Sequence, residues 1–284
     1  MIAVTGANGK LGTLVMEGLI KRVPATQIVA AVRDPGKAEG LRALGVQVRK
    51  ADYDDPQTLI NAFTGVEQVL LISAVVPGQR FGQHKSVIDA AKKAGVKLVA
   101  YTSMLRADTS TLILAAEHKA TEAYLTASGL DFVLLRNGWY LENMTDALAP
   151  ALTNGAIVGS ASNGRFAAAS RADYAEAAVK VLTQPGHVNK TYELAGDHPF
   201  AMPEFADEVS RQVGRTIAYK NLPPEEYEAM LLAIGLPKMI VDVVVDADVK
   251  SAKGELDSSS RDLSRLLGRS TTHFSDAIKA ALPA

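Results

Sequence analysis

The chain has 284 residues, and its 30 lysines and arginines against 31 aspartates and glutamates give a formal net charge of −1. This balance creates no global field that would favour a nucleic acid or an anionic membrane as a partner. Because the sequence has no cysteine, it excludes disulfides, thiolate metal sites and cysteine nucleophiles, and its five histidines lack the spacing of metal ligands.

The sequence predicts a globular protein without a membrane span. The longest apolar runs, such as residues 69–73, fall far short of the length that crosses a bilayer. The predicted fold begins at Met1, which leaves no room for a signal or transit peptide. We therefore expect a cytoplasmic protein.

Residues 1–136 alternate short β-rich runs with helical patterns. The predicted strands cover residues 2–5, 27–32, 46–50, 66–73, 96–103 and 130–136. Six strands separated by helices predict an α/β fold with a doubly wound parallel sheet, the Rossmann arrangement, in which helices cover both faces. We assign these residues to a dinucleotide-binding domain, whose ligands bind beyond the carboxyl ends of the strands.

Residues 137–284 are expected to form a smaller, mainly helical substrate domain. A strand is predicted at 191–195, and helices are predicted near 203–213, 223–234, 238–249 and 272–282. Residues 241–245 have the composition of a strand, but their flanks are helical. The segments near 165–196 are expected to return to the Rossmann core.

The strongest local motif follows the first predicted strand. Gly6 would let the chain turn, Gly9 would let it approach a pyrophosphate, and Gly12 would let the next helix lie close to the strand. This G-x-x-G-x-x-G spacing is typical of short-chain dehydrogenases, and the alternative is a glycine-rich turn without a ligand. The predicted cofactor residues of this turn are Gly6, Ala7, Asn8, Gly9, Lys10, Leu11 and Gly12.

Arg33 indicates which dinucleotide is bound. A site for NAD usually has an Asp or Glu at the end of the second strand, where it accepts a hydrogen bond from the ribose 2′-hydroxyl. Here that place, 21 residues after Gly12, holds Arg33. A guanidinium can pair with a 2′-phosphate, so the sequence favours NADP(H), and Lys10 could add a second positive charge. Asp34 is interpreted as the cap of the next helix, and the alternative for Arg33 is a solvated surface charge.

The usual proton-delivery device of carbonyl-reducing short-chain dehydrogenases is absent. None of the eight tyrosines has a lysine four positions later, so an ordinary ketone is a less favoured substrate than one whose product anion needs little help. The helix expected over 111–127 offers His118 and Glu122 instead, one turn apart. His118 could act as a proton donor, or the two residues could form a pair that only orders the helix. The candidate catalytic residues are Ser103, His118 and Tyr140.

Aromatic residues follow the sixth predicted strand, where the nicotinamide ring is expected. Trp139, the only tryptophan, and Tyr140 could form the wall of a pocket for a flat substrate by stacking. The alternative for Trp139 is a packing anchor.

Several longer motifs are distinctive as well. They are the opening twelve residues, Val-Arg-Asp-Pro at 32–35, Ala-Asp-Tyr at 51–53, Leu-Leu-Ile-Ser at 70–73, Ala-Tyr-Thr-Ser at 100–103 and Leu-Leu-Arg-Asn-Gly-Trp-Tyr at 134–140. In these motifs the chain resembles the NmrA-like branch of atypical short-chain dehydrogenases, first its bacterial NADPH:quinone oxidoreductases and next its triphenylmethane dye reductases.

The resemblance implies a two-domain fold that binds NADPH across the sheet, with a quinone or a planar dye between the domains. It also implies that the missing Tyr/Lys pair is a family trait. Besides the glycine turn and Arg33, the cofactor residues expected by position or at the strand ends are Ser73, Ala74, Val75, Thr102, Asn137, Gly138, Trp139, Tyr140, Leu141 and Glu142.

The sequence thus predicts an NADPH-dependent oxidoreductase that transfers hydride directly to a quinone. One alternative is a reductase of triphenylmethane or azo dyes. Another is a redox sensor that binds NADP without turnover, because the branch also contains regulators. The expected partner is a small planar substrate, with no nucleic acid and no membrane, and the expected state is a monomer or a homodimer.

Overall fold

The computed structural model describes residues 1–282 and consists of two compact units. The first unit is made of residues 1–107, 116–137 and 171–193, and the second contains 108–115, 138–170 and the chain from 194 onwards. The segment 171–193 therefore belongs to the same unit as the N-terminal strands.

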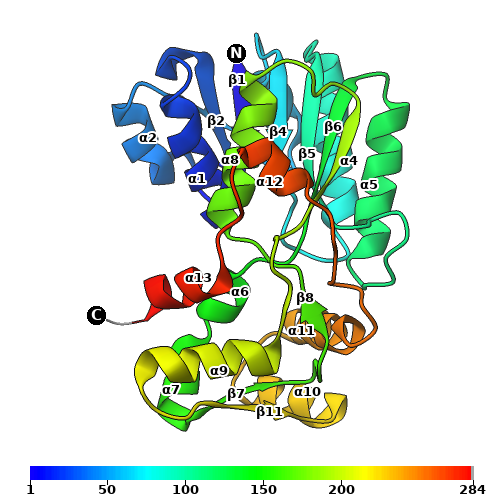
Figure 1. The fold of residues 1–284 in the computed structure, drawn as a ribbon. Helices are drawn as coiled ribbons and strands as arrows, with labels where there is room; N and C mark the ends of the chain where they lie inside the picture. Colours follow the sequence, from blue (N-terminus) through cyan, green and yellow to red (C-terminus); the bar gives the residue numbers. More distant parts are fainter. Residues whose placement is uncertain (283–284) are drawn as a thin grey trace. The chain divides into compact units, whose positions relative to one another are not determined.

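The first unit is built on a seven-stranded sheet with the strand order β3-β2-β1-β4-β5-β6-β9 (Figure 1). Its strands are β1 (Ile2–Thr5), β2 (Ile28–Val32), β3 (Gln47–Lys50), β4 (Gln68–Leu71), β5 (Leu98–Met104), β6 (Asp131–Asn137) and β9 (Lys190–Leu194). The first six pair in parallel, and the order of connection reverses at β1, which lies between β2 and β4. This is the predicted doubly wound sheet, and such a reversal creates the crevice in which α/β sheets bind ligands.

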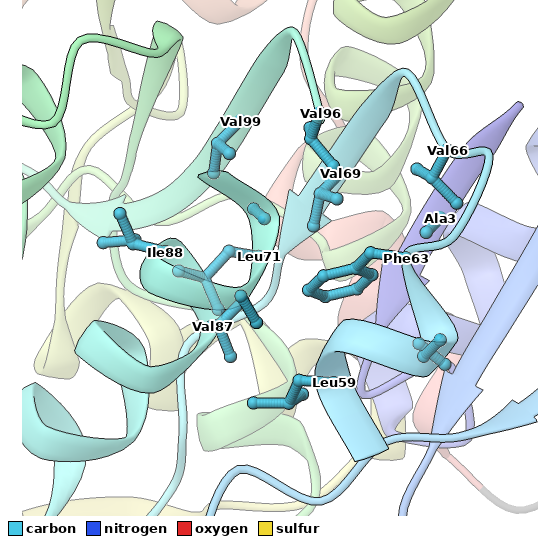
Figure 2. Close-up of a cluster of buried hydrophobic side chains, with 14 of the residues drawn as sticks. Ala3, Leu59, Phe63, Val66, Val69, Leu71, Val87, Ile88, Val96 and Val99 are labelled. Atoms are coloured by element: carbon cyan, nitrogen blue, oxygen red, sulfur yellow. The ribbon is translucent and has the colours of Figure 1, made fainter. Parts of the chain in front are cut away.

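One face of the sheet carries a continuous apolar core, part of which is drawn in Figure 2. Leu59 and Phe63, at α3 (Pro56–Ala62), and Val87 and Ile88, on α4 (Arg80–Lys93), pack against the strands. The labelled strand residues beneath them include Ala3, Val69, Leu71 and Val99. Alternate residues of these strands face this core because side chains alternate between the two faces of a sheet.

The remaining helices of the first unit are α1 (Lys10–Ile20), α2 (Glu39–Ala43), α5 (Ala115–Ala127) and α8 (Arg171–Thr183), with short 3-10 helices at Ala25–Gln27 and Pro35–Ala38. Helices α1 and α8 lie side by side (Figure 1). Leu11, Val15 and Leu19 of α1 are buried, as the predicted helical spacing requires.

The helix predicted over 111–127 begins at Ala115, four residues later than expected. The preceding residues bind elsewhere: the hydroxyls of Ser110 and Thr111 both donate to the carboxylate of Glu255, at 2.9 Å. The Ser110 hydroxyl also accepts the backbone N–H of Leu112. Side-chain hydrogen bonds of this kind compete with helix formation.

The second unit is mainly helical, as predicted. Its helices are α6 (Glu142–Thr145), α7 (Leu148–Asn154), α9 (Met202–Val213), α10 (Pro224–Ala233), α11 (Lys238–Ser251), α12 (Asp262–Leu267) and α13 (Phe274–Ala281). Two small sheets, which the sequence analysis missed, pair β7 (Ala156–Gly159) with β11 (Ala218–Asn221) and β8 (Arg165–Phe166) with β10 (Phe200–Ala201). Among residues 1–282, no helix is long and apolar enough to span a membrane.

Residues 241–245 lie in helix α11, so their strand-like composition is overruled by packing. Val241, Val244 and Val245 have the spacing of one helix face, and this face packs with Tyr227 and Leu231 of α10. Burial of the apolar face outweighs the small helix penalty of β-branched side chains.

Helix α1 lies so close to the end of β1 that only glycine fits at position 12. A Cβ atom on Gly12 would lie 2.2 Å from the carbonyl oxygen of Gly6 and 2.8 Å from the Cα of Ala7. Both of these are backbone atoms, so the clash could be relieved only by moving α1 away from the strand.

We expect Gly12→Ala to lower the free energy of unfolding by about 1–3 kcal/mol, the usual cost of overpacking. Gly40→Ala is the matched control, because a Cβ at Gly40 meets open space in the described structure. The control should change stability by less than about 1 kcal/mol. Urea unfolding of the three proteins measures the difference, and equal midpoints for both variants would contradict the close approach.

Candidate functional site

The glycine turn connects β1 to α1 and presents the beginning of the helix. Gly6 has a φ of 60°, in the left-handed region that favours glycine. The N–H of Gly9 donates to the carbonyl oxygen of Gly6 at 2.9 Å, which closes the turn. Gly9 is the N-cap residue of α1 and has no side chain that could bond to the first N–H groups of the helix. These N–H groups and the helix dipole form a site for an anionic phosphate.

Arg33 follows the last residue of β2 and is exposed. Within residues 1–282 its guanidinium has neither a hydrogen-bond partner nor an ion-pair partner. The neighbouring Asp34 forms no ion pair with Arg33. Its carboxylate accepts the N–H of Gly36 at 3.0 Å and caps the 3-10 helix that begins at Pro35. The predicted capping role of Asp34 is confirmed, and Arg33 is left as a cation available to a ligand.

The glycine turn and Arg33 lie at the same edge of the sheet. Strands β1 and β2 are adjacent and parallel, and Thr5 at the end of β1 pairs with Ala31 near the end of β2. A turn with uncapped N–H groups next to a guanidinium that has no partner among the described residues fits a dinucleotide with a pyrophosphate and a 2′-phosphate.

The segment after β4 lies beside this edge, because β4 pairs with β1. Ser73 donates its N–H to the hydroxyl of Thr102 on β5 at 2.9 Å. Thr102 is almost fully buried, so its side chain shapes this segment from below. Val75, in contrast, is 82% exposed. Backbone and side-chain atoms of residues 73–75 are thus presented at the carboxyl edge of the sheet.

His84, which the sequence analysis did not select, lies beneath the same segment. Its Nε2 accepts the N–H of Ala74 at 2.8 Å, and its Nδ1 lies 3.0 Å from the hydroxyl of Thr121. Burial and the charge of Arg80 lower the pKa of His84 to about 3, so the imidazole is neutral. A lone histidine on the buried face of a predicted helix gave no signal that it would bond to a loop.

His118 is buried and hydrogen-bonded to a tyrosine. Its Nδ1 lies 2.7 Å from the hydroxyl of Tyr101. Burial lowers the pKa of His118 well below its ordinary value, and the charge of Arg80 acts in the same direction. The imidazole is therefore neutral in the folded protein, and its role as a proton donor stays a prediction. The predicted pair with Glu122 is not formed, since Glu122 has other partners.

Ser103 belongs to a buried ionic cluster at the end of β5. Its hydroxyl donates to Oε1 of Glu122 at 2.6 Å. Glu122 binds Arg136 with both carboxylate oxygens, at 3.0 and 2.7 Å, and Arg136 also contacts Glu193 at 2.7 Å. Burial alone would lower the pKa of Arg136, but the two carboxylates raise it above the ordinary value. The Ser103 proton is held by a carboxylate, so this hydroxyl oxygen is placed to accept hydrogen bonds.

The segment after β6 contains the remaining predicted residues. Asn137 ends β6 in the first unit, where it pairs with Met104 and is almost buried. Gly138, Trp139 and Tyr140 are partly exposed and belong to the second unit. There the segment is fixed by Ala169, whose carbonyl accepts the N–H of Leu141 at 3.0 Å and whose N–H donates to the carbonyl of Trp139 at 3.1 Å. Leu141 is fully buried, and Glu142 begins α6.

The structure therefore brings most of the predicted residues together at one edge of the sheet of the first unit. They are Gly6 to Gly12 after β1, Arg33 after β2, Ser73 to Val75 after β4, Thr102 and Ser103 on β5, and Asn137 at the end of β6. The role of His84 and the pairing of Arg136 with Glu122 and Glu193 were not predicted, because the bonded residues are far apart in the sequence.

Comparison with known proteins identifies the family. A model of the protein family described as NAD(P)H-binding matches residues 6–185. Quinone oxidoreductase 2 of Escherichia coli (strain K12) is 49% identical over 278 residues, which cover 98% of this chain and 97% of that protein. The crystal structure of the NADPH-dependent quinone oxidoreductase of E. coli, complexed with NADPH, has a TM-score of 0.96 at 48% identity and 99% coverage of both chains.

The crystal structure of Citrobacter sp. triphenylmethane reductase, complexed with NADP(H), also has a TM-score of 0.96, at 38% identity and with 99% of this chain and 100% of that chain covered. The chain belongs to the NAD(P)H-binding family, and its resemblance to the NmrA-like branch is confirmed.

The neutral state of His84 predicts a pH dependence of stability. The ordinary pKa of 6.5 applies in the unfolded chain, whereas the folded protein keeps His84 neutral down to about pH 3. Protons therefore bind preferentially to the unfolded state between these values, and the free energy of unfolding decreases as the pH falls from about 6.5. Between pH 7 and pH 5, His84 should contribute a loss of about 2 kcal/mol.

We expect this loss to be smaller by about that amount in His84→Gln, as measured by urea unfolding at the two pH values. His118, Tyr101 and Arg80, which surround His84, are present in both proteins, so the difference reports mainly on the imidazole of His84. An identical pH dependence in both proteins would show that His84 takes up its proton in the folded state.

Proposed function

We propose that this protein, as a member of the NAD(P)H-binding family, is an NADPH-dependent oxidoreductase that reduces quinones. The observation that carries the proposal is the unpaired Arg33 guanidinium beside the glycine turn, in a chain that is 49% identical to a quinone oxidoreductase. An arginine at this position selects the 2′-phosphate of NADPH by a charge-assisted contact that NADH lacks.

The chemistry of a quinone fits the groups that the chain provides. When bound, NADPH supplies a hydride, and a quinone that accepts it becomes a hydroquinone monoanion, which takes one proton to give the hydroquinone. This monoanion is a far weaker base than an alkoxide, so water can protonate it. The chain accordingly lacks a tyrosine with a lysine four positions later, and its buried His118 is neutral and bonded to Tyr101. The protein's part is to position two flat rings and to exclude solvent.

A second candidate is the reduction of conjugated dyes. It is supported by the 38% identity and the TM-score of 0.96 with triphenylmethane reductase. A dye cation accepts a hydride at its central carbon, and a quinone accepts one at its conjugated dione. Both are electron-poor conjugated acceptors, so the same site can be tested with both. A redox sensor that binds NADPH without turnover is the remaining alternative. The substrate domain over residues 137–284, the cytoplasmic location and the monomeric or homodimeric state stay predictions.

The activity is tested by mixing the protein with NADPH and either a benzoquinone or a triphenylmethane dye, and by following nicotinamide absorbance. The proposal expects rapid loss of NADPH with the quinone and none with Gly9→Val, whose branched side chain would fill the space of the pyrophosphate. Circular dichroism verifies that this variant is folded. Turnover with the dye alone would favour the second candidate, and NADPH binding without any turnover would favour the sensor.

Arg33→Asp should weaken NADPH binding by roughly ten- to a hundredfold, which corresponds to about 1.5–3 kcal/mol. NADH binding should change little. Arg22→Asp is the matched control, because Arg22 is another exposed arginine of the first unit and follows the far end of α1, about 16 Å of helix away from the glycine turn. Fluorescence titration measures the Kd of each variant for NADPH and for NADH. Equal losses of NADPH affinity in the two variants would mean that the affinity depends on net charge and not on a contact with Arg33.

Single substitutions of the candidate donors should reduce turnover only modestly. For Ser103→Ala, His118→Gln and Tyr140→Phe we expect losses of at most about ten- to a hundredfold, below the range of about a hundred- to ten-thousandfold for general acid catalysis. Tyr140→Ala should mainly raise the quinone KM, since a stacking wall binds ground state and transition state alike. Loss of kcat in His118→Gln or Tyr140→Phe with normal NADPH binding would reveal a dedicated acid and point to a carbonyl substrate.

A further inference from the structure

The segment between β4 and α4, residues 72–79, is held by side chains of the helices beneath it. The backbone N–H and the backbone carbonyl of Ala74 are both hydrogen-bonded to side chains. The N–H donates to Nε2 of His84 at 2.8 Å, and the carbonyl oxygen accepts a hydrogen bond from Nε of Arg80 at 2.8 Å. Both side chains come from α4 and are buried, with Arg80 6% exposed. The segment is therefore fixed at its centre by charge-assisted and neutral hydrogen bonds.

The far end of the segment is held by α5. The carboxylate of Glu117 accepts the N–H of Gly78 at 3.0 Å and the N–H of Phe81 at 3.3 Å. The same carboxylate lies 3.7 Å from Nη1 of Arg80. Because Phe81 is in the first turn of α4, Glu117 also places a negative charge at the N-terminus of that helix, where it is stabilised.

The imidazole of His84 has a defined tautomer. Since Nε2 accepts a hydrogen bond, Nδ1 carries the proton and donates to the hydroxyl of Thr121 at 3.0 Å. The Thr121 hydroxyl in turn donates to the backbone carbonyl of Glu117 at 2.8 Å. The chain of bonds thus runs from the segment through α4 to α5, and it keeps the acceptor nitrogen aimed at Ala74.

Burying polar side chains costs free energy unless they are hydrogen-bonded. Arg80, His84 and Glu117 recover this cost through hydrogen bonds to the backbone of the loop 72–79 and of the first turn of α4. The loop's Ala74 peptide is bound from below, whereas Val75 beside it is 82% exposed. Ser73, Ala74 and Val75 are at the edge of the sheet that carries the glycine turn and Arg33. A loop that is fixed before the ligand arrives does not lose conformational freedom on binding.

We propose that Arg80, His84 and Glu117 are positioning residues that hold the loop 72–79 in the conformation that receives NADPH. This inference rests on the proposed function only in the identity of the ligand. Without the three side chains the loop samples other conformations, and the apparent Kd for NADPH rises in inverse proportion to the fraction of time that the loop spends in the competent one.

Two readouts test the proposal, and the first needs no nucleotide. Amide hydrogen exchange of residues 72–81 in the nucleotide-free protein reports whether the loop is held, and fluorescence titration reports the Kd for NADPH. We expect His84→Leu and Glu117→Gln to accelerate exchange in this segment and to raise the Kd about tenfold, the usual effect of one lost buried hydrogen bond. KM for NADPH should rise with Kd, while kcat at saturating NADPH should change less.

The control variants separate positioning from general stability. Tyr124→Phe removes another hydrogen bond between α5 and α4, the 2.6 Å contact of Tyr124 with Asp89, which lies about 7.5 Å beyond His84 along α4. It should leave both the loop exchange and the Kd within twofold of the wild type. His84→Gln keeps an acceptor for Ala74 and should restore most of the affinity that His84→Leu loses.

Normal loop exchange and a Kd within twofold in His84→Leu would overturn the proposal, even if the variant melts at a lower temperature. Should His84→Leu fail to fold, the partly exposed Glu117 gives the same test through Glu117→Gln. Wild-type protein that binds NADPH without reducing quinones would contradict the proposed activity alone, because both readouts are independent of turnover.

Discussion

The close approach of α1 to the end of β1 is the constraint on which the site depends. Gly12 has no room for a Cβ atom because the carbonyl oxygen of Gly6 would lie 2.2 Å from it. This contact fixes the direction in which α1 leaves the turn and therefore the direction in which its first N–H groups point. The parallel pairing of β1 with β2 then puts Arg33 on the same edge, and the pairing of β1 with β4 adds the loop 72–79. Three separate segments share a site because one strand lies between the other two.

Burial and hydrogen bonding determine the state of the polar side chains at this edge. His84 and His118 are withdrawn from water next to Arg80, so both are neutral near pH 7. The hydroxyl of Ser103 donates a hydrogen bond to Glu122, whose charge is balanced by Arg136. Breaking such a buried pair would be strongly destabilising, so these groups cannot exchange partners during turnover without cost. Their hydrogen bonds define the shape of the edge, and the exposed groups Arg33 and the glycine turn are left to contact a ligand.

The parts of this arrangement that could be predicted from the sequence are those with a local signal. β1 is found at the predicted residues, and the five following strands lie within a few residues of their predicted ranges, because short apolar runs and turns recur along the chain. The glycine spacing predicted the close contact at Gly12, and Asp34-Pro35 predicted a cap. The partners of Arg136 lie 14 and 57 residues away, and His84 bonds to Thr121 37 residues later. No local pattern marks such pairs, and the start of α5 was misplaced because Glu255, 144 residues beyond Thr111, binds the residues before it.

The pKa values of the groups near the site bear on the kind of substrate that the protein can reduce. A carbonyl reductase must protonate an alkoxide and so needs an acid whose pKa is tuned near the working pH. In the first unit burial shifts the pKa values of three titratable groups near the site away from the working pH. It lowers the pKa of His84 and His118, so that both are neutral, and it raises the pKa of Tyr101 far above its ordinary value. A site of this kind is suited to a substrate whose reduced form is a stabilised anion. The hydrogen bonds of His84 hold a loop and those of Arg136 hold a strand end, and such fixed elements are what a site needs when catalysis consists of positioning.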